Sequence, residues 1–177
     1  MAEIILRGSS DSYGFDPEDL NTIIGKGGMG VVFKGFSVST KKPVAIKVLY
    51  REVTINISNI ERERQSANIK IRHQNLVEVL DFIELNGIYH IITEFLEGES
   101  LNQHLERTGS EVNRRKLSEL ECLAIIKSTL MGLAELHKNG IVHRDIDPSN
   151  IFLCDNGGVK IMDFGIAKIT GDRKKSF

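Results

Sequence analysis

Three short motifs late in the chain constrain it most, because their order implies a shared site. They are His143-Arg144-Asp145, then Asn150, then Asp163-Phe164-Gly165, with a hairpin expected between the last two. A phosphoryl-transfer site needs one carboxylate beside the accepting hydroxyl and oxygen ligands that hold Mg²⁺ against a nucleotide. The pattern therefore favours Asp145 as the base that takes the hydroxyl proton, and Asn150 and Asp163 as Mg²⁺ ligands.

A glycine-rich turn precedes these motifs. Residues 25–32 read Gly-Lys-Gly-Gly-Met-Gly-Val-Val and fit G-x-G-x-x-G-x-V. Glycines let backbone N–H groups approach phosphates that a Cβ would hold off. A β-branched strand follows instead of a helix, which argues against a dinucleotide-binding fold, and no Gly-Lys-Ser/Thr closes a Walker A loop. A plain glycine-rich hairpin is the alternative.

Lys47 closes the strand-like run Val44-Ala45-Ile46-Lys47. A lysine among apolar strand neighbours suits a cation that binds the α- and β-phosphates and is held by a helix glutamate. Glu63 is the first candidate for that glutamate and Glu61 the second. An edge-strand lysine that only meets solvent is the alternative.

The hydrophobic pattern predicts two parts. Residues 1–20 are expected to form a loosely ordered leader. Residues 21–95 are expected to form a mainly β lobe, with strands over 23–24, 31–33, 44–48, 77–85 and 88–95 and a helix over 57–72. Asn86-Gly87 is a strong hairpin signal.

Residues 96–177 are expected to form a partial, mainly helical lobe. The capping box Ser118-Glu-Leu-Glu121 begins a helix that Asn139-Gly140 ends. Short strands are predicted at 141–142, 151–153 and 159–162. The predicted fold class is therefore α+β with two lobes.

Composition excludes several classes of protein. The chain has 177 residues, 41% hydrophobic and 27% charged, with a formal net charge of −1. This near-neutral balance gives no electrostatic reason to expect nucleic acid or an anionic membrane as a partner. No apolar stretch is long enough for a membrane helix, and the histidines lack the spacing of a zinc site. Cys122 and Cys154 are predicted to be reduced, and the expected location is the cytoplasm.

Together these motifs resemble the eukaryotic-type (Hanks-type) serine/threonine protein kinases, from about Thr22 to Phe177. The resemblance includes residues 73–77, His-Gln-Asn-Leu-Val, and the H-R-D-I-D-P-S-N run at 143–150. The style of residues 27–30 and 163–168 is similar to that of bacterial members. The resemblance implies ATP and Mg²⁺ as cofactors and a protein substrate with a serine or threonine acceptor, because Pro148-Ser149 favours that class over tyrosine kinases.

The resemblance also implies the nucleotide site. Thr93 would be the gatekeeper of the adenine pocket, and Glu94 to Leu96 the hinge that offers backbone hydrogen bonds. Val32, Ala45 and Leu153 would sandwich the adenine ring, and His143 would hold backbone in a packed column. The glycine-rich loop over the phosphates would comprise Ile24, Gly25, Lys26, Gly27, Gly28 and Gly30.

Two departures from the family pattern are expected to impair catalysis. Asp147 stands where serine/threonine kinases have a lysine that faces the transferred phosphate. At ~5 Å and an effective dielectric of ~20, each charge term is about 3 kcal/mol before screening, and half of that would slow transfer by roughly tenfold. An Asp147 that turns away or binds Mg²⁺ would soften the loss.

The second departure is that the resemblance breaks off shortly after residue 165, so a C-terminally incomplete domain is expected, with an exposed apolar patch on the 120–133 helix. A catalytically weak pseudokinase that binds ATP is the alternative function, and a small-molecule kinase is a third.

Overall fold

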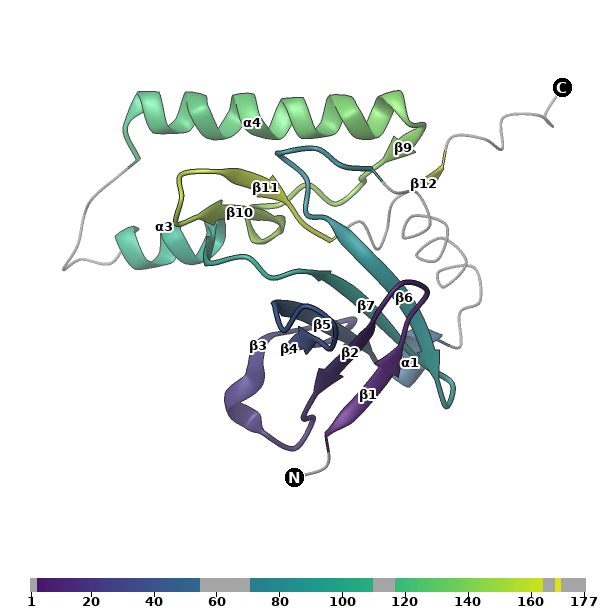
Figure 1. Cartoon of the computed structure of the whole chain (residues 1–177). Helices are drawn as coiled ribbons and strands as arrows, with labels where there is room; N and C mark the ends of the chain where they lie inside the picture. The colour runs from purple at the N-terminus through teal and green to yellow at the C-terminus, as the bar shows by residue number, and fades with distance from the viewer. Residues whose placement is uncertain (1–2, 55–70, 110–116, 164–167, 170–177) are drawn as a thin grey trace, which may run out of the picture. The chain divides into compact units, whose positions relative to one another are not determined.

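The computed structural model describes residues 3–54, 71–109, 117–163 and 168–169 (Figure 1). The chain divides into two compact units. The first contains Met1–Lys70 and Glu78–Leu96, and the second contains Ile71–Val77 and Glu97–Phe177. The division near residue 96 lies beside the predicted boundary, but residues 71–77 belong to the second unit and not to the first lobe as predicted. The reason is that Leu76 pairs with Ile161 of the second unit.

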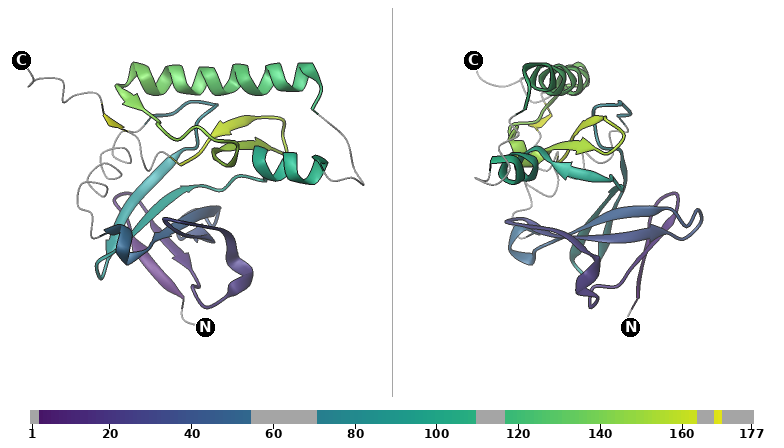
Figure 2. Two further views of the ribbon diagram at one scale, coloured as in Figure 1. Left: turned by 180° about the vertical axis from the view of Figure 1, so that it is seen from behind. Right: turned by 90° about the vertical axis from the view of Figure 1, so that its left-hand side faces the viewer.

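The first unit is built on a seven-stranded antiparallel sheet with the order β1-β2-β4-β5-β7-β6, and β3 pairs with β4 (Figures 1 and 2). Strands are favoured because these segments are rich in β-branched and aromatic residues, as in Val31-Val32-Phe33 and Ile91-Ile92. Its elements are β1 (Ile4–Arg7), β2 (Ser12–Phe15), η1 (Leu20–Thr22), β3 (Ile23–Gly27), β4 (Gly30–Ser37), β5 (Pro43–Leu49), α1 (Arg51–Thr54), β6 (Val79–Leu85) and β7 (Ile88–Glu94).

One face of this sheet forms the core of the unit. In β5, Val44 and Ile46 are buried, whereas the alternate residues Ala45 and Lys47 lie on the other face. The buried cluster comprises Leu6, Tyr13, Phe15, Phe33, Val44, Ile46, Ile83 and Ile92. The face that carries Lys47 is therefore the one that a ligand can use.

The prediction of a loose leader over residues 1–20 is wrong. β1 and β2 form a hairpin whose second strand pairs with β4, and Leu6, Tyr13 and Phe15 are buried. Burial raises the pKa of Tyr13 to about 12. The runs Ile-Ile-Leu-Arg and Ser-Tyr-Gly-Phe are too short to reveal a periodic pattern, and the polar turn between them resembled a linker.

Polar contacts hold this hairpin at both sides of its turn. Ser9 donates from its backbone N to Asp81 Oδ2 at 2.6 Å, which joins the turn to β6. Asp11 accepts hydrogen bonds from the hydroxyl groups of Ser37, the last residue of β4, and Ser39, and these bonds lower its pKa to about 2. The hairpin is thus bonded to the sheet as well as packed against it.

The predicted hairpin at Asn86-Gly87 is confirmed. It joins β6 to β7, and the two residues have φ of 53° and 73°. Positive φ at both central positions is the geometry of a type I′ turn, whose twist matches that of the strands. The predicted strands over 44–48 and 88–95 are confirmed as well, whereas the helix predicted over 57–72 lies almost wholly outside the described residues.

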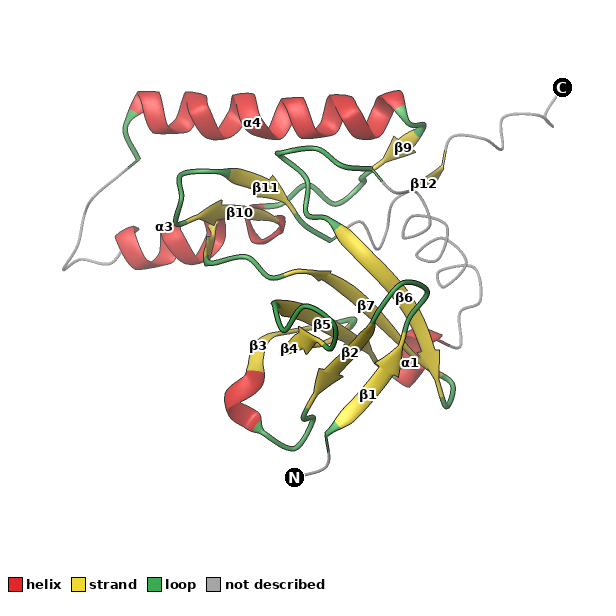
Figure 3. Ribbon diagram, viewed as in Figure 1, coloured by secondary structure: helices red, strands yellow, loops and turns green. Residues whose placement is uncertain are grey.

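The second unit contains helices and short strands (Figure 3). Its strands form a three-stranded sheet, β11-β10-β8, and a two-stranded one, β12-β9. Among the described residues, no helix combines the length and apolar character that crossing a membrane requires. The elements are β8 (Gly98–Ser100), α3 (Leu101–Gly109), α4 (Glu119–Lys138), β9 (Ile141–Val142), η2 (Pro148–Asn150), β10 (Ile151–Cys154), β11 (Val159–Ile161) and β12 (Lys168–Ile169).

Helix α4 has the predicted ends. Ser118 and Glu121 form a reciprocal capping box, and the helix ends at Asn139, before Gly140 with φ of 74°. Gly132 lies on the packed face of the helix and has no side chain. A Cβ at this position would lie 2.7 Å from the carbonyl oxygen of Asn75. Glycine therefore lets the helix approach the 71–77 segment.

The expected apolar patch on α4 is confirmed. Four leucine and isoleucine side chains point away from the packed face, and their exposed fractions lie between 55% and 77%. They are Leu120, Leu123, Ile126 and Leu130.

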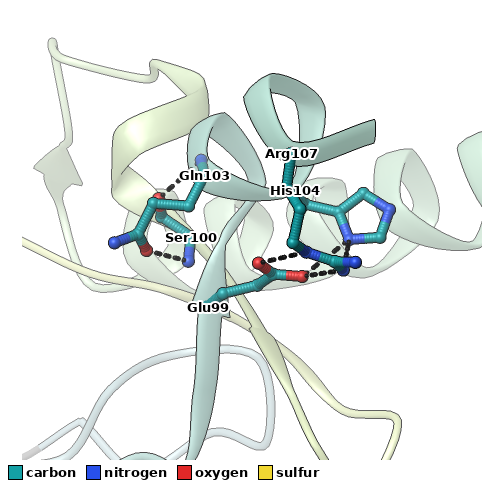
Figure 4. Close-up of polar contacts among 5 residues, drawn as sticks. All are labelled: Glu99, Ser100, Gln103, His104 and Arg107. Carbon is teal, nitrogen blue, oxygen red and sulfur yellow. Dashed lines mark hydrogen bonds and ion pairs between the residues drawn. The ribbon is translucent and has the colours of Figure 1, made fainter. Parts of the chain in front are cut away.

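Helix α3 was not predicted. Ser100 Oγ accepts from Gln103 N at 3.1 Å, and Gln103 Oε1 accepts from Ser100 N at 2.9 Å, which is another capping box (Figure 4). Glu99 Oε1 lies 2.6 Å from Arg107 Nη2 and 2.9 Å from His104 Nδ1. Hydrogen bonds from Arg107 and His104 lower the pKa of Glu99 to about 2. The Ser-x-x-Gln pattern was a signal that sequence analysis could have used.

Candidate active site

The glycine-rich loop is the hairpin between β3 and β4. Gly27 pairs with Gly30, so Gly28 and Met29 form the turn. A Cβ on Gly27 or Gly28 would meet nothing within 4 Å, whereas a Cβ on Gly30 would collide with the carbonyl oxygen of Val48. Gly30 is therefore required by the close approach of β5, and Gly27 and Gly28 leave the backbone open at the turn.

Four predicted nucleotide-contact residues share one face of the sheet. Val32 pairs with Lys47 across β4 and β5, and Ala45 pairs with Thr93 across β5 and β7. Because cross-strand partners point to the same face and residues 45 and 47 alternate in phase, these side chains lie together on the face opposite the core. All four are half-buried. Gly25, which pairs with Val32, adjoins them.

The predicted hinge follows β7. Glu94 donates its backbone N–H to Glu78 O at 3.0 Å, and its Oε1 accepts from Glu78 N at 2.9 Å. Thr93 Oγ1 donates to the Glu94 carbonyl at 3.2 Å. The Glu94 N–H is thus used inside the first unit, where Leu96 is the last residue.

Asn150 is fixed at four points in the second unit. Its Nδ2 donates to Asp145 O at 2.9 Å and to Asp145 Oδ2 at 3.1 Å. Its backbone N donates to Asp147 O at 2.9 Å, and its carbonyl accepts from Met162 N at 2.8 Å. Because Nδ2 faces Asp145, the amide oxygen Oδ1 is the atom of this side chain that can bind a cation.

His143 connects the Asp145 loop to the residue before Asp163. The ring is 1% exposed, its Nε2 donates to Met162 O at 2.9 Å, and its Nδ1 accepts from Asp145 N at 3.3 Å. A carbonyl can only accept, so one neutral tautomer satisfies both hydrogen bonds. The prediction that His143 holds backbone is confirmed.

Backbone strain lies at the same motifs. Arg144 has φ of 68° and Asp163 has φ of 58°, in the left-handed region that costs energy for residues other than glycine. Such conformations persist where the surroundings fix them, and here the His143 and Asn150 hydrogen bonds surround both positions.

The side chain of Asp147 forms hydrogen bonds with Ser149, two residues later. Its Oδ1 accepts from Ser149 N at 2.9 Å and from Ser149 Oγ at 2.6 Å, which caps η2. These hydrogen bonds lower the pKa of Asp147. The carboxylate is therefore bonded within its own turn. The Asp-Pro-Ser sequence is a turn signal that could have predicted it.

Comparison of the sequence with known families shows which family the chain belongs to. The sequence profile of the protein kinase domain matches residues 19–177. The chain belongs to the protein kinase family. The β1–β2 hairpin precedes the matched stretch, so the buried residues Leu6, Tyr13 and Phe15 lie outside the part that the profile covers.

Similar proteins are serine/threonine kinases. A probable serine/threonine-protein kinase of Dictyostelium discoideum is 38% identical over 81% of this chain and 28% of its own length. Serine/threonine-protein kinase PrkC of Bacillus subtilis is 36% identical over 82% of this chain and 22% of its own. PknA of Corynebacterium glutamicum is 38% identical over 84% of this chain and 32% of its own length. The chain thus spans about a fifth to a third of the length of these curated relatives.

The oxygen donors of Asn150 and Asp163 fit Mg²⁺. Mg²⁺ takes hard oxygen ligands, is held by one or two protein groups, and fills its remaining positions with water and substrate phosphate. Asn150 offers an amide oxygen and Asp163 a carboxylate, and the Met162 hydrogen bond links their segments. Within the residues that the structure describes, no group of three or more His, Cys, Asp and Glu side chains could hold a metal.

The remaining predicted site residues are Leu153, Ile24, Glu63 and Glu61. Leu153 is in β10 and packs against Ile125, Ile151 and Val159 of the second unit. Ile24 is 46% exposed in β3. Glu63 and Glu61 lie outside the described residues. Sequence reasoning missed Met162, whose backbone N and O hold Asn150 and His143, because a backbone role leaves no side-chain signal.

Proposed function

We propose that this chain transfers the γ-phosphoryl group of ATP to a serine or threonine hydroxyl of a protein. The observation that carries the proposal is the set of hydrogen bonds from Asn150 Nδ2 to Asp145, which leaves the amide oxygen for a cation beside a carboxylate that can take a proton. The membership of the protein kinase family and the serine/threonine kinases among its relatives support it.

In the proposed reaction, Asp145 takes the proton of the substrate hydroxyl as its oxygen bonds to the γ-phosphorus. The bond from that phosphorus to the bridging oxygen breaks, and ADP leaves with the electron pair. Bound Mg²⁺ neutralises phosphate charge, and Asn150 and Asp163 would hold it. Lys47 would bind the α- and β-phosphates, and Glu63 would hold Lys47 in place.

The nucleotide would use the sheet face opposite the first unit's core. Val32, Ala45 and Thr93 share that face, and they would contact the adenine ring. Its hydrogen bonds would come from the backbone of Glu94 and Leu96, and Gly25 to Gly30 would cover the phosphates. Because ATP is the phosphoryl donor, the proposed location is the cytoplasm.

A non-catalytic ATP-binding module is the second candidate. The observation that favours it is Asp147, an acid where the family resemblance implies a phosphate-facing lysine. The closeness of Asp145, Asn150 and His143 favours catalysis instead, because a binding module has no need of a fixed base.

Two measurements separate the candidates. Transfer of radiolabelled phosphate from ATP to a generic serine/threonine protein should fall by about 10²-fold or more in Asp145→Asn, since general base catalysis contributes that much. Thermal stabilisation by ATP should require Mg²⁺ in both proteins. Stabilisation with equal background transfer in both proteins would support the binding module and remove the enzyme.

A further inference from the structure

Asp147 makes a local contact that its charge alone does not explain. The carboxylate is exposed, yet its Oδ1 accepts two hydrogen bonds from Ser149, one from the backbone N at 2.9 Å and one from the hydroxyl at 2.6 Å. An oxygen that binds the N–H group two residues later closes an Asx turn, which lowers the freedom of the residues inside it.

This turn leads directly to Asn150. Asp147 contributes its side chain to Ser149 and its carbonyl oxygen to Asn150 N at 2.9 Å, so both ends of the turn are fixed by one residue. Pro148 lies between them and has a restricted φ. From there Asn150 Nδ2 reaches Asp145, and Asn150 O accepts from Met162 N. Asp147 and Asn150 are therefore connected by a hydrogen bond as well as by the three-residue backbone of the turn.

We propose that Asp147 is a positioning residue, whose carboxylate caps the turn over residues 147–150 and presents Asn150 to the cation and Asp145. The need to hold Asn150 in this place rests on the proposed function, in which Asn150 binds the cation. The proposal assigns the acid a favourable role at a position where the sequence alone predicted impaired phosphoryl transfer.

The cap and the charge can be separated by matched variants of the whole chain. Asp147→Asn keeps an acceptor oxygen at the same place and removes the charge, because asparagine caps as well as aspartate does. Asp147→Ala removes both. Ser149→Ala removes the hydroxyl donor but keeps the backbone one. The readouts are amide hydrogen exchange at Ser149 and Asn150 without nucleotide, and kcat and KM for Mg²⁺-ATP.

We expect Asp147→Ala to speed exchange at Ser149 by about fivefold, the typical effect of losing a cap, and to weaken transfer. Asp147→Asn should exchange like the unmodified chain and transfer at least as fast, and Ser149→Ala should lie between them. The proposal is overturned if the asparagine and alanine variants exchange alike, or if alanine transfers as fast as asparagine.

The exchange measurement keeps this test independent of the proposed function. It needs no ATP, so it reports on the turn even if the unmodified chain transfers no phosphate. Absence of transfer and of Mg²⁺-dependent ATP binding in the unmodified chain would refute the proposed function, whereas unchanged exchange in Asp147→Ala would refute the role of Asp147.

Discussion

The buried ring of His143 donates from Nε2 to the carbonyl oxygen of Met162 across 2.9 Å. The same ring accepts the backbone N–H of Asp145 at 3.3 Å. Asp145 and Met162, the residue before Asp163, are therefore joined through one imidazole, although eighteen sequence positions separate Asp145 from Asp163. The proton acceptor and the Mg²⁺ ligand of the proposed reaction depend on it for their relative position in the second unit.

Replacing this imidazole should loosen both segments. His143→Ala removes this donor from the carbonyl oxygen of the half-buried Met162, and leaving a buried polar group unsatisfied typically costs about 1–3 kcal/mol. We expect a loss of stability in that range and faster amide exchange at Asp145. His137→Ala is the matched control, because His137 is exposed on α4. Equal effects of the two substitutions on exchange at Asp145 would contradict the connecting role.

The N-terminal hairpin should stabilise the first unit. Leu6 is 1% exposed and belongs to the core, so Leu6→Ala should lower the free energy of unfolding by about 2–5 kcal/mol. Ile5, its neighbour in β1, is 45% exposed. Ile5→Ala should change the stability far less when both are measured by urea denaturation. A hairpin that merely rests on the sheet would make the two variants equivalent.

Substitutions at two glycines of the loop should differ in their effect on stability. Gly30→Ala places a Cβ against the carbonyl oxygen of Val48, so β4 and β5 must move apart, and we expect a loss of stability of about 1–3 kcal/mol. Gly28→Ala has open space and should unfold almost like the unmodified protein. Thermal unfolding of the two variants checks this, and equal midpoints would show that β5 does not restrict residue 30.

Acid should destabilise the first unit through His90. This residue is 4% exposed, and its Nδ1 has no hydrogen-bond partner among the described residues. Burial lowers its pKa, so the unfolded chain binds a proton more readily, and stability should fall as the pH drops below about 6.5. Asp11 and Glu99, whose pKa values are about 2, do not act in that window.

Urea unfolding at pH 7.5 and 5.5 tests the role of His90. His90→Leu should remove most of the acid sensitivity, while His137→Gln, which changes an exposed histidine, should keep it. The account of His90 fails if the leucine variant loses as much stability between the two pH values as the unmodified protein.

Local signals in the sequence predicted the parts of the fold that local chemistry determines. The Asn86-Gly87 turn and the Ser118 capping box need only neighbouring residues, and both are confirmed. The β1–β2 hairpin was missed because its strands are defined by partners distant in the sequence, such as Ser37 and Asp81. Burial of Leu6 against the sheet cannot be read from four residues.

The candidate site shows the same division. The order of the motifs predicted Asp145, Asn150 and Asp163 as site residues. The hydrogen bonds of Met162 are made by its backbone, so its residue type could not predict them. Gly30 fits the phosphate-loop pattern, yet a glycine is required there because the carbonyl oxygen of Val48 leaves no room for a Cβ. Asp147 suggested a repulsive charge, and its bonds to Ser149 became visible only in three dimensions.

The most direct test of the account is ATP affinity measured by calorimetry with and without Mg²⁺. If Lys47, Asn150 and Asp163 serve one nucleotide, Lys47→Met should weaken ATP binding about tenfold or more, while Asp163→Asn should remove the gain that Mg²⁺ gives. Lys42→Met, which changes an exposed lysine before β5, should bind ATP like the unmodified protein. ATP binding that is indifferent to Mg²⁺ and equal in all these variants would contradict the central claim.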